Sequence, residues 1–160
     1  MAQKQIINSG GLSLIKGLQN AYEDLTKNKG MVSQVDKRPF QLGENIATSK
    51  GSVIQRTEMY ELIQYAPTTE KVHETPLIIF PPWINKFYIL DLKERNSLIK
   101  WVVDQGFTLF VVSWVNPDAT YRDVSMTDYV EDGYITALQT VREICGVKKV
   151  NAVGYCIAGT

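Results

Sequence analysis

The stretch Lys149-Val-Asn-Ala-Val-Gly-Tyr-Cys-Ile-Ala-Gly-Thr160 decides how the chain is interpreted. The short apolar run of residues 150–153 predicts a buried strand, and small residues surround a thiol directly after it. This order is typical of a nucleophile elbow, where a strand ends, the backbone turns sharply and the nucleophile begins a helix. The flanking positions must be small, because side chains there would strike the neighbouring strand or helix.

Cys156 is therefore the candidate nucleophile. A cysteine in this position indicates thioester chemistry, because the thiolate is the attacking species and the N-terminus of a following helix helps to lower the pKa of the thiol. Small residues around a cysteine are also found where an inert buried thiol is tightly packed. Residues 154–159 alone leave both interpretations open.

The composition excludes several classes of protein. The chain has 160 residues, of which 44% are hydrophobic and 21% charged, enough for one domain with a core. Seventeen Lys and Arg balance 17 Asp and Glu, so we expect no nucleic-acid partner, because that affinity depends on clustered positive charge. No apolar run approaches the ~20 residues of a transmembrane helix, and the N-terminus lacks a long apolar signal core. We expect a cytoplasmic protein.

Cysteine and histidine are too few for a structural metal site. Two cysteines, Cys145 and Cys156, and the single His73 argue against both a zinc site and a disulfide scaffold. Cys145 falls on the inward stripe of a predicted helix, where we expect an inert small hydrophobic residue. We predict no metal ion.

Residues 1–52 are expected to form an N-terminal segment of helical and irregular structure. Apolar side chains recur at helical spacing from Leu12 to Leu25, which predicts a helix within residues 10–30. We expect this stripe to pack against its own domain; the alternative is a helix that docks on a partner or a lipid surface. Residues 31–52 have poor periodicity and predict mostly loop.

Residues 53–160 predict the N-terminal part of a wound α/β domain. Residues 53–65 look extended, and the apolar runs 77–80 and 108–114 predict strands covered on both faces. From residue 76 the order is strand, helix, strand, helix, strand, which favours a mostly parallel sheet with right-handed crossovers. In such sheets active sites gather at the carboxyl ends of the strands, where Cys156 stands.

The sequence does not decide which residues cap the N-termini of the two helices. Asn96 or Ser97 caps the first helix. The second has two competing capping boxes, Ser125 with Asp128 and Asp128 with Glu131.

An acyl-transfer site also needs hydrogen-bond donors for the oxyanion. In an elbow, one donor is the backbone N–H of the residue after the nucleophile, here Ile157. The second comes from the loop after an earlier strand, residues 81–85, in which neither proline carries an N–H. We predict that Ile84 is this donor, with Trp83 as the fallback; the alternative is that both side chains only pack.

Other side chains near the strand ends have two interpretations each. Asp91 either approaches the mouth of the site or caps a helix or turn. The aromatic residues Trp114, Tyr121 and Tyr155 either line an acyl channel or belong to the core.

The chain resembles poly(3-hydroxyalkanoate) synthases of the class I type. The similarity extends from about Gln5 to the last residue and is most specific in Pro81-Pro-Trp-Ile-Asn-Lys86, which is followed by Ile89-Leu-Asp-Leu92. Val112-Ser-Trp-Val-Asn-Pro-Asp118 and Gly154-Tyr-Cys-Ile-Ala-Gly-Thr160 also resemble the family. The resemblance implies an α/β-hydrolase-type parallel sheet in residues 53–160.

The resemblance also implies an activity and its partners. Members of the family are acyltransferases that polymerise (R)-3-hydroxyacyl-CoA into polyester and release CoA, with a cysteine that corresponds to Cys156 as the acyl carrier. The CoA thioester is the substrate, and no cofactor is implied. The growing polyester chain is the second partner, and the granule surface is the expected location. A homodimer, or pairing with a missing C-terminal part, is expected.

Two departures from the family pattern matter. Ala158 occupies the first of two paired glycines, and we expect only a slight shift in packing. The family's catalytic Asp and His lie well downstream of the cysteine, so we expect residues 1–160 alone to have no polymerase activity. His73, beside Glu74, is an implausible substitute base and is expected in an exposed turn.

Two other functions stay open from the sequence. One is a thioesterase or lipase-like hydrolase with a cysteine nucleophile. The other is a non-catalytic protein that binds the granule or a full-length synthase. An open strand edge in so short a sheet would also favour aggregation.

Overall fold

The computed structural model describes residues 2–160 and contains two compact units. The first unit ends at Phe40, and the second runs from Gln41 to Thr160. The loop of residues 41–50 belongs with the sheet of the second unit. Ser49 shows this, because its amide and hydroxyl donate hydrogen bonds of 3.1 and 2.9 Å to the carboxylate of Asp91.

The first unit contains two helices, α1 (Ala2–Asn8) and α2 (Leu12–Lys27). The predicted helix is confirmed, and within residues 2–40 no residue of α2 is buried, so this unit does not itself cover the apolar stripe. Within residues 2–40 the only other described helix is α1, whose seven residues are too few to cover the stripe. The exposed residues of the stripe are Leu12, Ile15, Leu18, Tyr22 and Leu25.

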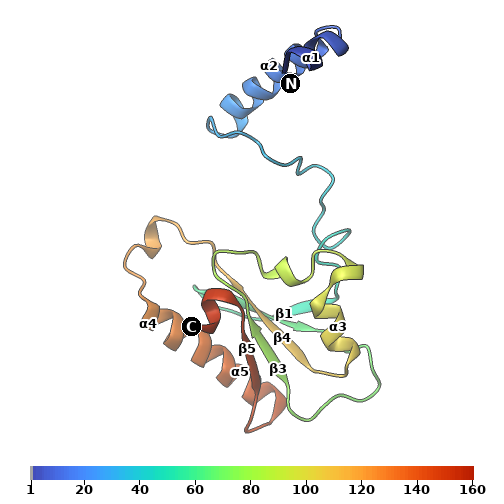
Figure 1. Cartoon of the computed structure of the whole chain (residues 1–160). Coiled ribbons are helices and arrows are strands. Elements are labelled where there is room, and N and C mark those ends of the chain that lie inside the picture. The colour runs from blue at the N-terminus through green and yellow to red at the C-terminus, as the bar shows by residue number, and fades with distance from the viewer. Residues whose placement is uncertain (1) are drawn as a thin grey trace. The chain divides into compact units, whose positions relative to one another are not determined.

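The second unit is built on a five-stranded sheet with the order β1-β2-β4-β3-β5 (Figure 1). β3 runs parallel to both β4 and β5, as predicted. The strands are β1 (Gly51–Arg56), β2 (Tyr60–Tyr65), β3 (Leu77–Phe80), β4 (Leu109–Trp114) and β5 (Asn151–Gly154).

The expectation of a mostly parallel sheet is corrected by β1 and β2. β1 pairs with β2, and β2 pairs with β4, both in antiparallel fashion. Only three residues separate β1 from β2, too few for a parallel crossover. Thr57 closes this turn, where its hydroxyl accepts hydrogen bonds from the amides of Met59 and Tyr60. The fold is therefore a mixed α/β sheet.

The helices of the second unit begin with defined caps. In α3 (Leu98–Asp104) the Ser97 hydroxyl accepts a hydrogen bond of 2.8 Å from the amide of Lys100. The second helical run consists of α4 (Met126–Asp128), a π-helix (Tyr129–Ile135) and α5 (Thr136–Cys145). Of the two competing capping boxes, the one between Ser125 and Asp128 forms.

The helices cover opposite faces of the sheet, with α3 on one side and α5 on the other (Figure 1). On the α3 face, Ile99 and Val103 pack with Ile79 and Val111. On the α5 face, buried side chains of the helix pack with the alternate residues of the same strands. The predicted strands 77–80 and 108–114, observed as β3 and β4, are therefore buried from both sides.

β5 is the exception among the predicted buried strands. All four of its residues are exposed, so the expectation of burial there is wrong. Within residues 2–160, β5 pairs only with β3 and forms an edge of the described sheet. An edge strand covered on neither face leaves even apolar side chains in solvent, and Val153 is 44% exposed.

Short 3₁₀-helices occupy several of the loops. They are Phe87–Leu90, Glu94–Asn96, Ala119–Tyr121 and Cys156–Gly159.

Candidate active site at the end of β5

A sharp bend follows β5 and carries the candidate nucleophile. Cys156 has a φ of 58° and begins the 3₁₀-helix Cys156–Gly159. Non-glycine residues rarely adopt this left-handed region, and when they do the strain is concentrated at functional sites. The side chain of Cys156 is exposed.

The bend is held by close contact between two glycines. A Cβ added to Gly154 would overlap the backbone of Ala158 and lie 2.7 Å from the Cα of Gly159. A Cβ added to Gly159 would lie 2.9 Å from the carbonyl oxygen of Gly154. The methyl group of Ala158 is instead buried in the core on the α5 face. The bend therefore needs glycine at 154 and 159 and accommodates alanine at 158.

The loop after β3 lies beside the bend. The amide of Tyr155 donates a hydrogen bond of 3.0 Å to the carbonyl of Phe80, the last residue of β3. The loop then turns, with the amide of Asn85 donating to the carbonyl of Pro82. Within the described residues 2–160, the amides of Trp83 and Ile84 donate no hydrogen bond. Both amides can therefore donate to a bound group.

An aromatic cluster supports the bend from the α5 face, and sequence reasoning missed it. Trp114 donates a hydrogen bond of 2.7 Å from Nε1 to the carbonyl of Pro81. Tyr134 stacks on Phe80 with centroids 4.5 Å apart, and its hydroxyl donates to the carbonyl of Ala158 at 3.3 Å. The only signal in the sequence is that Tyr134 falls on the inward stripe of its helix.

The π-helix allows this cluster to form. An added Cβ at Gly133 would lie 2.8 Å from the ring of Trp114, so the ring packs directly on the helix backbone. Tyr129, in the same π-helix, stacks on Trp83 with centroids 4.7 Å apart. π-Helical turns occur frequently at functional sites because they change which side chains face the core.

Of the other candidate residues, Asp91 and Tyr121 have structural partners outside the bend. The carboxylate of Asp91 is fully buried and bonded to Ser49, so this residue holds the loop of residues 41–50. The hydroxyl of Tyr121 donates to the carbonyl of Glu58. Tyr155 is exposed and Trp114 is in the core, so of the three aromatic residues only Trp114 packs beneath the bend.

His73 lies before β3, at the end of the parallel strands opposite to Cys156. Its ring contacts Phe107, with centroids 4.6 Å apart, and its Nε2 is 3.1 Å from the carbonyl of Gln105. The expectation of an exposed position is confirmed. Cys145 is half-buried, and burial raises the pKa of its thiol.

Neither a metal centre nor a membrane span is found in the part of the chain that the structure describes. Residues 2–160 contain no group of three or more side chains that could hold a metal ion. None of the helices described is both long and apolar enough to cross a bilayer.

Together these features define an α/β protein with a candidate nucleophile elbow, in which a sharp bend presents an exposed thiol beside free backbone amides. Residues 1–102 match the family model described as "Poly-beta-hydroxybutyrate polymerase (PhaC) N-terminus". The chain therefore belongs to this family.

Curated relatives extend the similarity to nearly the whole chain. The chain is 46% identical over 159 residues to the poly(3-hydroxyalkanoate) polymerase subunit PhaC of Cupriavidus necator, covering 99% of this chain and 27% of the relative. It is 47% identical over 159 residues to the poly(3-hydroxyalkanoate) polymerase of Methylorubrum extorquens, covering 98% and 26%. The chain thus spans about a quarter of the length of these relatives.

Proposed function

We propose that this chain supplies the acyl-carrying cysteine of a polyhydroxyalkanoate synthase, an acyltransferase of the α/β-hydrolase type. The observation that carries the proposal is the exposed Cys156, held at φ 58° on a bend at the carboxyl end of a parallel strand. The names of its relatives supply the reaction class.

In the first step, the Cys156 thiolate attacks the thioester carbonyl of an (R)-3-hydroxyacyl-CoA. The bond between that carbonyl carbon and the CoA sulfur breaks, and CoA leaves and takes up a proton. One thioester replaces another, so the acyl group on Cys156 stays activated. A thiol suits this exchange better than a hydroxyl, because the thiolate is a strong nucleophile near neutral pH.

The negative charge that develops on the carbonyl oxygen needs fixed donors. We assign the backbone amide of Ile157 as one donor and the amide of Ile84 as the other, with Trp83 as the fallback. The support is that the loop after β3 lies beside the bend and that its two amides have no partner in residues 2–160. Backbone donors of this kind contribute several kcal/mol, about 3–4 for one donor in a well-studied protease.

In the second step, the hydroxyl group of another acyl unit attacks the acyl-Cys156 thioester. An ester bond forms, the thiolate of Cys156 leaves, and a general base accepts the hydroxyl proton. His73 cannot be this base, because it lies at the opposite end of the parallel strands. We therefore propose that the base comes from residues outside 1–160, on the same polypeptide or on a partner.

Incubation of purified residues 1–160 with (R)-3-hydroxybutyryl-CoA tests this proposal. We expect each chain to release one CoA and carry one acyl group, with no polymer formed. Continuous CoA release with free hydroxy acid as the only product would favour the alternative hydrolase. Continuous release with polymer would show that the chain contains its own base, contrary to the proposal.

The exposed stripe of α2 favours a second function, association with a polyester granule or another synthase molecule. Its apolar side chains follow one helical face, and none is buried within residues 2–40. Deletion of residues 1–40 should abolish co-sedimentation with polyester granules while leaving the single acylation of Cys156 intact. Unchanged co-sedimentation would reject this second function.

A further inference from the structure

A cavity lies at the other edge of the sheet from Cys156. It has a volume of about 220 Å³ and is bounded by β1, β2 and the loop of residues 41–50. β1 forms one edge of the sheet and β5 the other, so this cavity and the bend are separate sites. We name it the Tyr65 pocket; its walls include Leu42, Ala47, Val53, Ile63 and Phe87.

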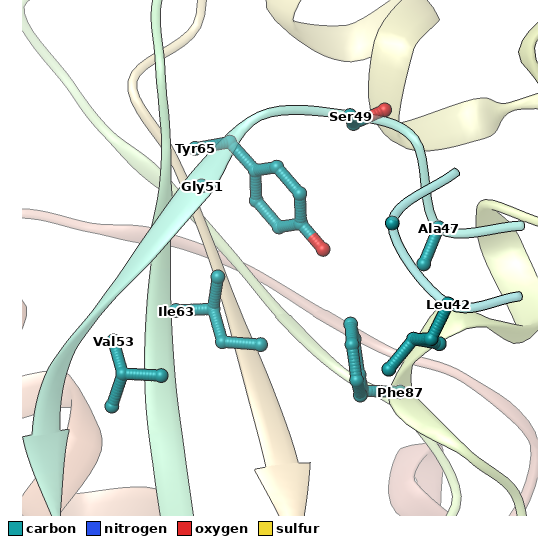
Figure 2. Close-up of a pocket in the computed structure, with 9 residues that line it drawn as sticks. Leu42, Ala47, Ser49, Gly51, Val53, Ile63, Tyr65 and Phe87 are labelled. Carbon is teal, nitrogen blue, oxygen red and sulfur yellow. The ribbon is translucent and has the colours of Figure 1, made fainter.

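One polar group points into this apolar pocket. Figure 2 shows the ring of Tyr65 extending from β2 toward Leu42 and Phe87, with the hydroxyl at its tip. The residue is only 4% exposed, and no hydrogen bond of its hydroxyl to another group of residues 2–160 is found. No buried side-chain polar atom of residues 2–160 lacks a partner, so this hydroxyl is reached by solvent through the pocket. A ligand with a matching acceptor would replace water at the hydroxyl.

The charge beside the pocket selects the type of ligand. Burial, followed by the negative charge of Asp91, raises the pKa of Tyr65 well above its ordinary value. The hydroxyl therefore remains a protonated donor at physiological pH. The same negative charge disfavours an anionic ligand. The hydroxyl of Ser49 is already bonded to Asp91, so it does not compete as a donor.

The size of the pocket suits a short aliphatic group. An apolar cavity of about 150 Å³ accommodates benzene, and this pocket, at about 220 Å³, is larger. Leu42, Val53, Ile63 and Phe87 offer hydrocarbon surface around the single donor. A neutral ester of four or five carbons matches both features.

We propose that the Tyr65 pocket binds one ester unit of a short-chain polyester, with the Tyr65 hydroxyl donating to the ester carbonyl. The identity of the ester as a segment of the product chain rests on the proposed function. The pocket would hold the growing chain at a distance from the nucleophile and keep it aligned on the protein.

The test measures binding of methyl (R)-3-hydroxybutyrate, an ester of five carbons, to the full 160-residue chain by ligand-observed NMR. We expect the neutral ester to bind at least about tenfold more tightly than the (R)-3-hydroxybutyrate anion. Tyr65→Phe, which removes only the hydroxyl, should weaken ester binding about fivefold, the effect of one hydrogen bond. Equal binding by wild type and Tyr65→Phe would overturn the proposal.

A second experiment blocks the pocket with a bulky side chain. Val53 and Val72 are each 45% exposed, but only Val53 lines the pocket. Val53→Trp should abolish ester binding, whereas Val72→Trp should leave it unchanged, with folding of both checked by amide NMR dispersion. Ester binding that survives Val53→Trp, or the absence of ester binding in the wild type, would refute the site.

The two proposals fail separately. Cys156→Ala should not change ester binding, because the thiol lies at the opposite sheet edge. Loss of ester binding with intact acylation would remove only the pocket proposal. Intact ester binding without acylation of Cys156 would remove the proposed function and leave a site for neutral esters.

Discussion

The amide of Tyr155 donates a hydrogen bond of 3.0 Å to the carbonyl of Phe80. This bond continues the β3–β5 ladder by one residue beyond Gly154 and fixes the backbone directly before Cys156. It also sets the loop of residues 81–85 against the bend. The relation between nucleophile and oxyanion donors thus depends on the parallel pairing of two short strands.

Substitution of Gly154 tests the geometry of the bend. The methyl group of Gly154→Ala would overlap the backbone of Ala158, so the 3₁₀-helix has to shift. We expect a loss of about 1–3 kcal/mol of stability and at least a tenfold slower alkylation of Cys156 by iodoacetamide. Gly17→Ala is the control, because nothing lies within 4 Å of its added Cβ. Equal alkylation rates in both variants would contradict the described bend.

Tyr134 is expected to stabilise the bend through its hydroxyl. Tyr134→Phe removes the hydrogen bond to the carbonyl of Ala158 but keeps the ring stacked on Phe80. We expect a decrease of about 0.5–1.5 kcal/mol in the free energy of unfolding, measured with urea. The matched control is Tyr88→Phe, because the hydroxyl of Tyr88 makes no hydrogen bond within residues 2–160. An equal change in the free energy of unfolding in both variants would contradict a stabilising role of the Tyr134 hydroxyl.

The wound part of the fold was predictable because it depends on local pattern. Apolar runs such as Leu77–Phe80 identify buried strands. Ser97 predicts the start of α3, and Gly146 predicts the end of α5. The antiparallel pairing of β2 with β4 was not predictable in this way, because it joins residues about 50 positions apart and no local signal specifies it.

The sequence-based predictions failed where the burial of a residue depends on tertiary contacts. The apolar residues of β5 resemble those of a central strand, but the strand lies at an edge and is exposed. The π-helix depends on the fit of Gly133 to the Trp114 ring, a tertiary contact that helical periodicity does not encode. The position of Cys156 follows from the local motif, whereas the Tyr65 pocket requires Asp91 to hold a distant loop.

The pair formed by Asp36 and Arg38 gives a pH prediction. Hydrogen bonds from the Arg38 side chain and backbone lower the pKa of Asp36 to about 2. A lowered carboxylate pKa stabilises the folded form above the ordinary pKa of about 4, and this contribution is lost as the pH falls toward 2. We expect NMR titration to place the Asp36 midpoint near 2, and Arg38→Ala to return it toward the ordinary value. An unchanged midpoint in Arg38→Ala would show that the pair does not form.

The exposed edge at β5 predicts self-association. Unpaired strand edges template further pairing, and a charged side chain on the edge opposes it. We expect Val153→Lys to reduce the aggregation measured by light scattering at high protein concentration. Val72→Lys should have no effect, because Val72 lies in a loop and its exposed fraction of 45% is close to the 44% of Val153. Equal suppression by both variants would indicate a general effect of charge, independent of the edge.

The most direct test of the central claim is to locate the acyl group by peptide mass spectrometry after incubation with (R)-3-hydroxybutyryl-CoA. The chain offers an internal comparison, because Cys156 is exposed, whereas Cys145 is half-buried with a thiol pKa raised by burial. We expect the acyl group on the Cys156 peptide, full loss of labelling in Cys156→Ala, and unchanged labelling in Cys145→Ala. An acyl group found on Cys145, or labelling that persists in Cys156→Ala, would contradict the assignment of Cys156 as the acyl carrier.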